Sequence, residues 1–370
     1  MKYYLVAGEA SGDLHGANLM KELKRLDPQA EFRFFGGDLM LAEGGTLVKH
    51  YAEMAYMGIV EVIMNLPTIL ANMKQCKQDL LSWKPNALIL IDFPGFNLKI
   101  AEFAKKQGIN VNFYISPKVW AWNQKRVLKI KRVVDHLFCI LPFEVDFYKQ
   151  WDMQVDYVGN PLLDAVAAFK PDNNFLVKYN LTGKKLIALL PGSRKQEISK
   201  LLPDMLAVID QFKGYQFVIA GAPSFNVDYY APYLQGKRIP IVFNATYDLL
   251  SNADAAIVAS GTAALETALL NVPQVVVYKG QPLFITIGRL VVKVKFISLV
   301  NLIMNRPVVK ELIQEDCNPK TIAAELDALL NNTAYRRQML ADYDELDQLM
   351  GEPGASAKTA QLIIGYIQKG

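Results

Sequence analysis

The sequence has few cysteines and little excess charge. Cys76, Cys139 and Cys317 are the only cysteines among 370 residues, and they show no Cys-x-x-Cys spacing. They predict neither a disulfide framework nor a zinc site, and they fit a reducing cytoplasm. Lys and Arg number 40 against 36 Asp and Glu, a net charge of +4. That excess is too small to indicate a nucleic-acid-binding protein, which needs clustered basic charge.

Long apolar runs are also missing. No stretch approaches ~20 uncharged apolar residues, so the sequence predicts no transmembrane helix. The opening residues MKYYLVAGEASGD lack the apolar core and cleavage site of a signal peptide. Hydrophobic residues make up 52% of the chain, and its length favours two domains of about 150 residues or more. We therefore expect a soluble cytoplasmic protein, or one that rests on a membrane surface.

Short apolar runs alternate with helical patterns through both halves of the chain. Such alternation is typical of parallel sheets covered on both faces, so we predict an α/β fold with two Rossmann-like domains. The turn at 8–13 is expected to precede a helix over 14–26, and the polar stretch 171–185 is interpreted as the interdomain linker. The predicted strands are 2–7, 32–36, 87–92, 111–116, 136–141, 186–193, 215–221, 255–260 and 274–280.

The first candidate site is the glycine-rich turn VAGEASGDLHG at 6–16. Its glycines let backbone N–H groups approach a ligand at a helix N-terminus. Glu9 is placed at the tip of the first predicted strand, where ligands of such sheets bind. Ser11 or Asp13 capping the helix is an equally simple explanation of the polar residues.

The second and third candidates follow the next strands. Asp92 comes directly after the apolar run LILI, where partial desolvation would raise its pKa and suit it to act as a general base. Capping of the turn before Pro94 is the alternative. The string YISPKVWAWNQKR places Trp120 and Trp122 beside basic residues, a combination that can hold a sugar face and a phosphate. Packing at a domain interface explains the tryptophans equally well.

Two strings in the second half indicate a phosphate site. LLPGSRKQE ends a predicted strand in a turn with Ser193 and Arg194, and we expect its free N–H groups to cradle a diphosphate. In ASGTAALETALL a helix starts directly after a strand, and Glu266 lies one turn beyond Thr262 on the same face. Backbone amides there would hold a phosphate while the carboxylate accepts ribose hydroxyls.

Other signals are weak. Asp342 and Asp344 spell a metal-binding DxD, but the surrounding charged helical pattern favours a solvated helix face. The three histidines show no metal-ligand spacing. The apolar stretches 54–73 and 283–300 could form an acyl-chain groove, a surface for anionic lipid, or core helices.

Seven strings occur in order from residue 5 to about residue 320: AGEASGD, MGIVEV, YISPKVWAW, LPFE, LLPGSRKQE, ASGTAALE and NRPVVKELIQ. Together they resemble the lipid A disaccharide synthase family. The resemblance implies a GT-B architecture, with two Rossmann-like domains that face each other across a cleft. It implies an acceptor-side domain at 1–168, joined by a final helix at about 352–370, and a UDP-sugar donor-side domain at 169–351.

The resemblance also implies a reaction. A 2,3-diacylglucosamine unit passes from UDP-2,3-diacylglucosamine to 2,3-diacylglucosamine 1-phosphate with inversion, giving the β-1,6 disaccharide 1-phosphate and UDP. Neither a metal nor another cofactor is expected, and neither is a nucleic-acid partner. The enzyme would be cytoplasmic and peripheral on the inner face of the inner membrane, and a homodimer is left open.

Roles follow for residues that match the family's motifs. Asp92 is the candidate base, Glu9 orients the acceptor or replaces Asp92 as base, and Arg194 stabilises the departing diphosphate. The expected donor-binding residues are Gly192, Ser193, Arg194, Ser260, Gly261, Thr262, Ala263 and Glu266. The expected acceptor- or sugar-binding residues are Gly8, Ser11, Gly12, Asp13, His15, Trp120 and Asn301.

The chain departs from the family pattern at three positions. Val300 stands where a proline is frequent, and Asn160 stands where many relatives have histidine. Gly95 replaces a second carboxylate, which leaves Asp92 as the sole acid of its motif. Rival readings are another UDP-sugar enzyme of the same architecture, such as a UDP-N-acetylglucosamine 2-epimerase, and a non-catalytic nucleotide-binding protein.

Overall fold

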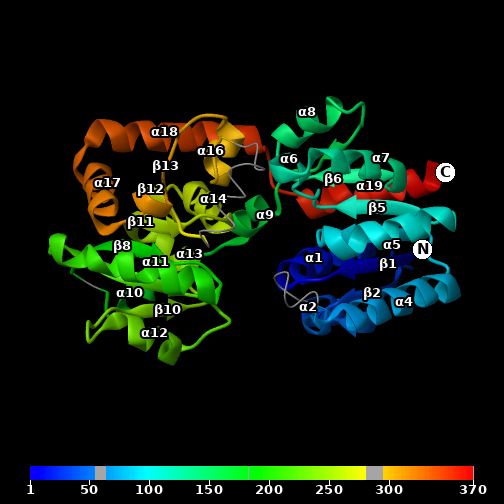
Figure 1. Ribbon diagram of the computed structural model, residues 1–370, viewed down its shortest axis with the longest axis horizontal. Helices are drawn as coiled ribbons and strands as arrows, with labels where there is room; N and C mark the ends of the chain where they lie inside the picture. Colours follow the sequence, from blue (N-terminus) through cyan, green and yellow to red (C-terminus); the bar gives the residue numbers. More distant parts are fainter. Residues whose placement is uncertain (55–63, 182, 281–294, 370) are drawn as a thin grey trace. The chain divides into compact units, whose positions relative to one another are not determined.

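The computed structural model describes residues 1–54, 64–181, 183–280 and 295–369. The chain divides into two compact units, unit 1 with Met1–Asp164 and Glu352–Gly370, and unit 2 with Ala165–Gly351 (Figure 1). Each unit is built on a parallel sheet with helices on both faces. The predicted fold class is confirmed.

Unit 1 has a seven-stranded sheet in the order β3-β2-β1-β4-β5-β6-β7. The strand order reverses direction between β1 and β4, and ligands of open α/β sheets bind at such a point, outside the carboxyl ends of the strands. The strands are β1 (Lys2–Ala7), β2 (Glu31–Gly36), β3 (Thr46–His50), β4 (Ala87–Ile91), β5 (Asn110–Tyr114), β6 (His136–Cys139) and β7 (Asp156–Tyr157).

The helices of unit 1 form two layers (Figure 1). Alternate residues of each central strand point to opposite layers, which is why these strands are apolar throughout. Tyr4 and Val6 pack toward α4, α5 and α7, whereas Tyr3 and Leu5 pack toward α1 and α19. The helices are α1 (Ala10–Leu26), α2 (Asp38–Ala42), α4 (Leu66–Trp83), α5 (Pro94–Lys106), α6 (Val119–Trp122), α7 (Val127–Val133), α8 (Phe143–Lys149), α9 (Pro161–Ala168, shared with unit 2) and α19 (Ala355–Lys369).

Unit 2 has a six-stranded sheet in the order β10-β9-β8-β11-β12-β13. Its strands are β8 (Lys185–Leu190), β9 (Tyr215–Gly221), β10 (Ile241–Phe243), β11 (Ala253–Ala259), β12 (Gln274–Tyr278) and β13 (Lys310–Ile313). Its helices are α10 (Phe175–Lys178), α11 (Lys195–Ala207), α12 (Val227–Leu234), α13 (Thr246–Ser251), α14 (Thr262–Leu269), α16 (Leu299–Met304), α17 (Pro319–Asn331) and α18 (Thr333–Met350).

Two local predictions are wrong. Helix α1 begins at Ala10, inside the glycine-rich turn that was expected to last to Asp13. Glycine is a poor helix former, which is why the helix was expected to start later. Gly12 nevertheless lies inside α1, because the helix packs closely on β1: a Cβ added to Gly12 would be 3.2 Å from Cβ of Ala7. The polar stretch 171–185 is not a linker either, since it belongs to unit 2, forms α10 and buries Phe175.

Candidate active site

The candidate site of unit 1 lies where β1 and β4 end. Gly8 follows β1, and Phe93 follows β4 by two residues. The two turns interlock, because a Cβ added to Gly8 would lie 2.3 Å from Cδ1 of the Phe93 ring. Only glycine leaves room for the ring at this position, so this glycine of the first motif is explained by packing.

The backbone of Asp92 is strained and firmly held. Asp92 has a φ of 45° and Phe93 a φ of 49°. This left-handed region costs a non-glycine residue roughly 1–2 kcal/mol. The N–H of Asp92 donates to the carbonyl of Tyr114 at 3.1 Å, and its carbonyl accepts from Nδ2 of Asn97 at 2.7 Å. Strained residues that persist in this way concentrate at functional sites.

Two charged side chains, Lys118 and Glu9, act on the Asp92 carboxyl at this edge. Burial raises the pKa of the Asp92 carboxyl, the ammonium of Lys118 lowers it, and the nearby Glu9 carboxylate raises it further. Glu9 is half-buried at the N-terminus of α1, and its side chain makes no capping bond there. A partly desolvated carboxylate with a raised pKa suits proton abstraction near neutral pH.

Asp13 serves the fold. Its side chain is only 3% exposed, and its two oxygens accept the backbone N–H groups of Gly37, Leu39 and Met40 at 2.7, 3.1 and 3.1 Å. These bonds fix the start of α2 after β2. Asp13 thus caps a helix, as the alternative explanation supposed, but the helix is α2 and not its own.

The other residues of the first motif line α1. Ser11 is exposed in its first turn, while Gly12 is buried against β1. His15 is partly buried, and burial lowers its pKa to about 4, so its imidazole is neutral at physiological pH. Its Nδ1 is buried and has no hydrogen-bond partner among the described residues.

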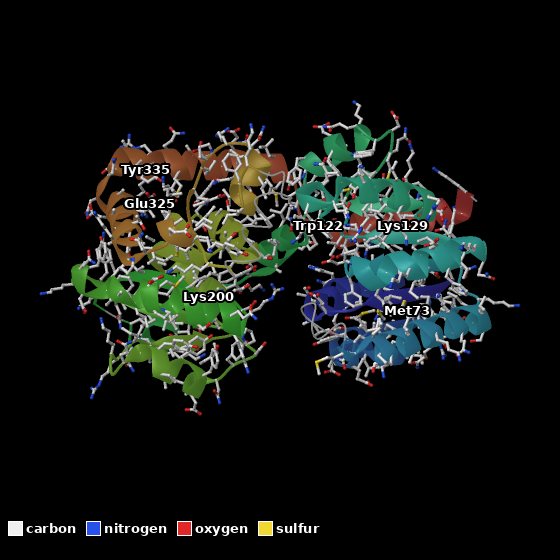
Figure 2. All side chains as sticks on the ribbon, in the orientation of Figure 1. Met73, Trp122, Lys129, Lys200, Glu325 and Tyr335 are labelled. Carbon is white, nitrogen blue, oxygen red and sulfur yellow. The ribbon has the colours of Figure 1, made fainter. Side chains whose placement is uncertain are left out.

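The two tryptophans differ in exposure. Trp120 is 7% exposed, and its indole N–H donates to Oε1 of Glu144 at 3.1 Å. Trp122, labelled in Figure 2, is 48% exposed. The guanidinium of Arg126 lies over its ring, 5.0 Å from the ring centre. Burial of Trp120 favours the packing explanation for that residue, within unit 1.

Glu144 anchors the tryptophan loop. It is 1% exposed and accepts the N–H groups of Ile140 and Leu141 at 3.2 and 3.0 Å, besides that of Trp120. Burial raises the pKa of its carboxyl to about 7, in spite of these hydrogen bonds. One carboxylate therefore joins the LPFE segment to the SPKVWAW segment, two strings whose connection the sequence does not show.

The phosphate turn of unit 2 departs from expectation. The N–H groups of Ser193 and Arg194 are not free, since both donate to Oε2 of Glu197 at 3.1 and 3.3 Å. Gly192 has a φ of 103°, which glycine adopts without strain. The Arg194 guanidinium is exposed, and its Nη1 lies 3.7 Å from Oε1 of Glu197. A carboxylate thus occupies the N–H groups expected to hold the diphosphate.

The second phosphate turn lies between β11 and α14. Ser260 donates through its hydroxyl to the carbonyl of Ile297 at 3.1 Å, and α14 begins at Thr262 directly after Gly261. Ala263 lies in its first turn. Glu266 is one turn along, and burial raises the pKa of its carboxyl.

Asn301 is enclosed in unit 2 and is 1% exposed. Its Oδ1 accepts the N–H groups of Val308 and Val309 at 2.8 and 2.9 Å, while its Nδ2 donates to the carbonyl of Val309 and to Glu311 at 2.9 Å each. The amide has used its donors and acceptors. In this conformation it fixes the segment after α16.

Some predictions fall partly outside the described residues. Residues 55–63 of the apolar stretch 54–73, with the MGIVEV string, are among them, as are residues 283–294 of the stretch 283–300. Asp342 of the DxD lies on α18 and pairs with Arg306 at 2.9 Å. Within the described ranges, no cluster of three His, Cys, Asp or Glu residues could hold a metal. No helix in those ranges is long and apolar enough to cross a membrane.

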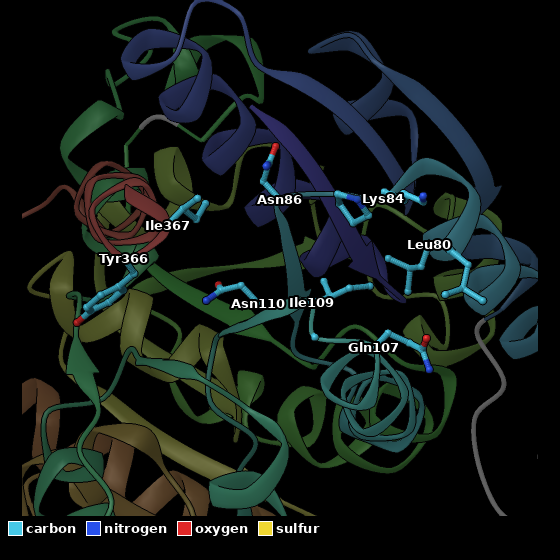
Figure 3. A pocket seen from close by; sticks show the side chains of 11 residues that line it. Leu80, Lys84, Asn86, Gln107, Ile109, Asn110, Tyr366 and Ile367 are labelled. Atoms are coloured by element: carbon cyan, nitrogen blue, oxygen red, sulfur yellow. The ribbon is translucent and has the colours of Figure 1, made fainter. Parts of the chain in front are cut away.

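A cavity of about 530 Å³ lies elsewhere on unit 1 (Figure 3). Lys84 and Asn86 line it just before β4, Ile109 and Asn110 at the start of β5, and Tyr366 on α19. These are amino ends of strands. Ligands of parallel sheets bind at the carboxyl ends, so this cavity is not the candidate site.

Four residues with contacts at these sites were given no role by the sequence alone. They are Asn97, Glu144, Glu197 and Tyr247. Glu197 had a local signal, since it lies three residues after Arg194, the spacing of a capping box. Each of the other three also has a partner well separated in sequence, which no local pattern marks: Val6 for Asn97, Trp120 for Glu144, and Glu266 for Tyr247, whose hydroxyl donates to that carboxylate.

The two-unit fold is shared with solved structures of low sequence identity. A UDP-N-acetylglucosamine 2-epimerase from Neisseria meningitidis bound to UDP-N-acetylglucosamine superposes with a TM-score of 0.68 at 12% identity, covering 100% of both chains. A MurG structure from Acinetobacter baumannii gives 0.59 at 13% identity, covering 100% of this chain and 99% of that one. The protein is thus an α/β protein of the GT-B class, which contains both glycosyltransferases and epimerases.

Sequence similarity identifies one particular family. The family model described as Lipid-A-disaccharide synthetase matches residues 3–363. A lipid-A-disaccharide synthase from Trichlorobacter lovleyi is 39% identical, covering 99% of this chain and 97% of that protein. One from Syntrophus aciditrophicus is 40% identical with the same coverage. The chain belongs to the lipid-A-disaccharide synthetase family, as its seven strings indicated.

Proposed function

We propose that this chain is the glycosyltransferase that joins two diacylglucosamine units into the lipid A disaccharide. It transfers 2,3-diacylglucosamine from UDP-2,3-diacylglucosamine to the 6-hydroxyl of 2,3-diacylglucosamine 1-phosphate. The bond between the anomeric carbon and UDP breaks as the new β-1,6 bond forms, and UDP leaves. Membership of the family over nearly the whole chain supports this reaction.

The observation that carries the mechanism is the partly buried carboxylate of Asp92, directly after the end of β4. In a single displacement, one base removes the proton of the attacking hydroxyl. Burial raises the pKa of Asp92, which suits this task, while the positive charge of Lys118 lowers that pKa and favours the ionised carboxylate. Glu9, which acts on the same carboxyl, would bind the acceptor's hydroxyls or replace Asp92 as base.

Unit 2 would supply the donor site. The departing diphosphate gains negative charge, which Arg194 and the N-termini of α11 and α14 would stabilise. Glu197 mimics that anion on the N–H groups of Ser193 and Arg194, so the diphosphate would have to replace its carboxylate. Glu266 would accept ribose hydroxyls. These positive groups could supply the charge stabilisation that a metal provides in other transferases.

UDP release tests the proposal directly. Purified full-length protein receives the UDP-diacylglucosamine donor with and without the monosaccharide 1-phosphate acceptor, in EDTA. We expect acceptor-dependent UDP release that survives chelation and falls by about 10²–10⁴-fold in Asp92→Asn. Release abolished by EDTA would contradict the metal-free mechanism. Conversion of UDP-N-acetylglucosamine without UDP release would favour an epimerase.

We also propose that unit 1 rests on the anionic inner surface of the inner membrane. Residues 64–135 contain twelve Lys and Arg against four Asp and Glu. This segment is therefore strongly basic, although the net charge of the whole chain is only +4. Helices α4, α5 and α7 of this region cover one face of the sheet (Figure 1). Trp122 and Lys129 lie on this part of unit 1 (Figure 2). Exposed apolar side chains accompany the charges: Leu66, Leu70, Trp122 and Leu128.

Vesicle flotation tests this surface. We expect binding to vesicles that contain anionic phospholipid and little binding to zwitterionic ones. Reversing Lys125, Lys131 and Arg132 to Glu should weaken binding by about 1 kcal/mol per residue. The same reversal at Lys184, Lys213 and Lys310 of unit 2 is the control for net charge. Equal weakening by both triple variants would contradict the assignment to unit 1.

A further inference from the structure

Asn97 is a buried residue of the first turn of α5 whose side-chain amide binds only backbone. It is 0% exposed. Its Nδ2 donates to the carbonyl of Asp92 at 2.7 Å and to the carbonyls of Val6 and Ile91 at 3.3 Å each. Asn97 therefore ties the end of β1 to the end of β4 through one group.

The orientation of this amide is fixed by its surroundings. The reverse orientation would turn Oδ1 toward three carbonyl oxygens, where neither group could donate. In the observed orientation Oδ1 of Asn97 is buried and has no partner among the described residues. An unsatisfied buried acceptor destabilises the folded state, so Oδ1 gives no reason for an amide at this position. The hydrogen bonds that Nδ2 of Asn97 donates account for it.

The three carbonyls belong to the strand ends that carry the reactive carboxylates. Val6 lies three residues before Glu9, and Ile91 directly precedes Asp92. Asp92 is in a left-handed conformation, and its carbonyl makes the shortest of the three bonds. Without that bond, a peptide rotation at residue 92 would release the strain and redirect the carboxylate.

We propose that Asn97 is a positioning residue for the transfer reaction, which holds the Asp92 carboxylate in its reactive direction and at a fixed spacing from Glu9. It acts through the backbone and touches no substrate. The inference rests on the proposed function, because it takes Asp92 as the base.

The test compares two buried asparagines. Asn97→Leu keeps the side chain's size and removes its donors. Asn112→Leu is the matched control, since Asn112 of β5 is also 0% exposed, also has an unpartnered Oδ1 among the described residues, and bonds only Asn110. We expect kcat to fall about 10- to 100-fold in Asn97→Leu, with the KM for the donor nearly unchanged. Asn112→Leu should retain kcat per folded molecule.

A pH profile separates positioning from loss of structure. When the carboxylate of Asp92 is no longer held in its buried position, its pKa falls toward the ordinary value. The acidic limb of kcat/KM should therefore move to lower pH in Asn97→Leu and stay in place in Asn112→Leu. A merely structural defect lowers the amount of active enzyme and leaves the limb unmoved.

A second variant covers the case in which Asn97→Leu does not fold. Asn97→Ser keeps one donor, and we expect a smaller loss of kcat with the same direction of shift. An unmoved limb in the folded variants, or equal losses of kcat at both asparagines, would overturn the inference. Full activity in Asp92→Asn would instead overturn the proposed base, whatever the Asn97 variants do.

Discussion

The hydroxyl of Tyr247 donates a 2.7 Å hydrogen bond to Oε1 of Glu266. Tyr247 lies on α13 and Glu266 on α14, so the bond joins the helix after β10 to the helix after β11, two strands that β9 and β8 separate in the second sheet. Phe169 packs edge-on against the Tyr247 ring at 5.4 Å. The carboxylate that we assign to ribose is thus held in place by a phenol, which lowers its pKa against the effect of burial.

Removing that hydroxyl should weaken recognition of ribose. In Tyr247→Phe we expect UDP to bind about 2- to 10-fold more weakly, the equivalent of roughly 0.5–1.5 kcal/mol for one hydrogen bond. The preference for UDP over 2′-deoxy-UDP should shrink as well, because Glu266 is no longer held. Calorimetry with both nucleotides checks this, with Tyr215→Phe at the amino end of β9 as control. An unchanged preference would contradict the ribose role.

The close packing of Gly8 against the Phe93 ring leads to a second prediction. A methyl group at Gly8 would lie 2.3 Å from the Phe93 ring, so Gly8→Ala must displace the turn that carries Asp92. Overpacking of this kind costs about 1–3 kcal/mol, and we expect a large loss of kcat besides. Gly95→Ala is the control, since nothing lies within 4 Å of its added Cβ. Urea unfolding and UDP release measure both effects.

Asp92 should cost the protein stability. Its pKa is raised in the folded state, so the native protein holds this proton more tightly than the unfolded chain does. That contribution is complete below the ordinary pKa and is lost as the pH rises through the folded pKa. Asp92→Asn does not titrate, and asparagine tolerates a positive φ well. We expect the variant to gain stability over the wild type in urea unfolding as the pH rises above 3.8, the ordinary pKa of an aspartate, while its activity is lost.

Much of this site could be predicted from residue order. An apolar run followed by a polar residue marks the end of a buried strand, and this pattern singled out Asp92. Glu266 was singled out because it lies one turn beyond Thr262 in a helix that starts directly after a strand. The alternation of strands and helices likewise indicated two parallel sheets. Such signals are local, because each depends on residues that are neighbours in the sequence.

The partners of these residues could not be predicted in the same way. Asp13 was expected to cap the N-terminus of its own helix, but its carboxylate oxygens accept hydrogen bonds from N–H groups 24 to 27 residues away. Asn97 reaches 91 residues back to Val6. Which polar group satisfies which buried strand end depends on the order of strands in the sheet, and a single sequence does not specify that order.

The carboxylate of Glu197 provides a test of the donor turn. Because it occupies the N–H groups of Ser193 and Arg194, it competes with the diphosphate that we place there. Glu197→Gln removes the negative charge, so we expect tighter UDP binding and a helix α11 less stable by about 0.5–1 kcal/mol. Asp210→Asn, an exposed acid paired with Lys237, controls for net charge. Weaker UDP binding in Glu197→Gln would show that the carboxylate shapes the site instead.

Glu144 should make unit 1 sensitive to pH. Burial raises the pKa of its carboxyl from an ordinary 4.5 to about 7. Between these values the folded state keeps a proton that the unfolded chain releases, so stability falls by up to about 1.4 kcal/mol per pH unit as the pH rises, and levels off above pH 7. Glu144→Gln does not titrate, although its amide cannot accept the indole N–H of Trp120 as well as a carboxylate does.

The difference in unfolding free energy between wild type and Glu144→Gln isolates this group, since other titrations cancel. We expect the unfolding free energy of the wild type to fall steadily relative to that of Glu144→Gln from pH 4.5 to pH 7, and the difference between the two to stay constant above pH 7. Glu102→Gln, at an exposed ion pair with Lys129, should give a nearly flat curve. Tryptophan fluorescence follows the unfolding of both variants, and Trp120 also reports on its own hydrogen bond to Glu144. A flat curve for Glu144→Gln would mean that its hydrogen bonds to Ile140, Leu141 and Trp120 outweigh burial.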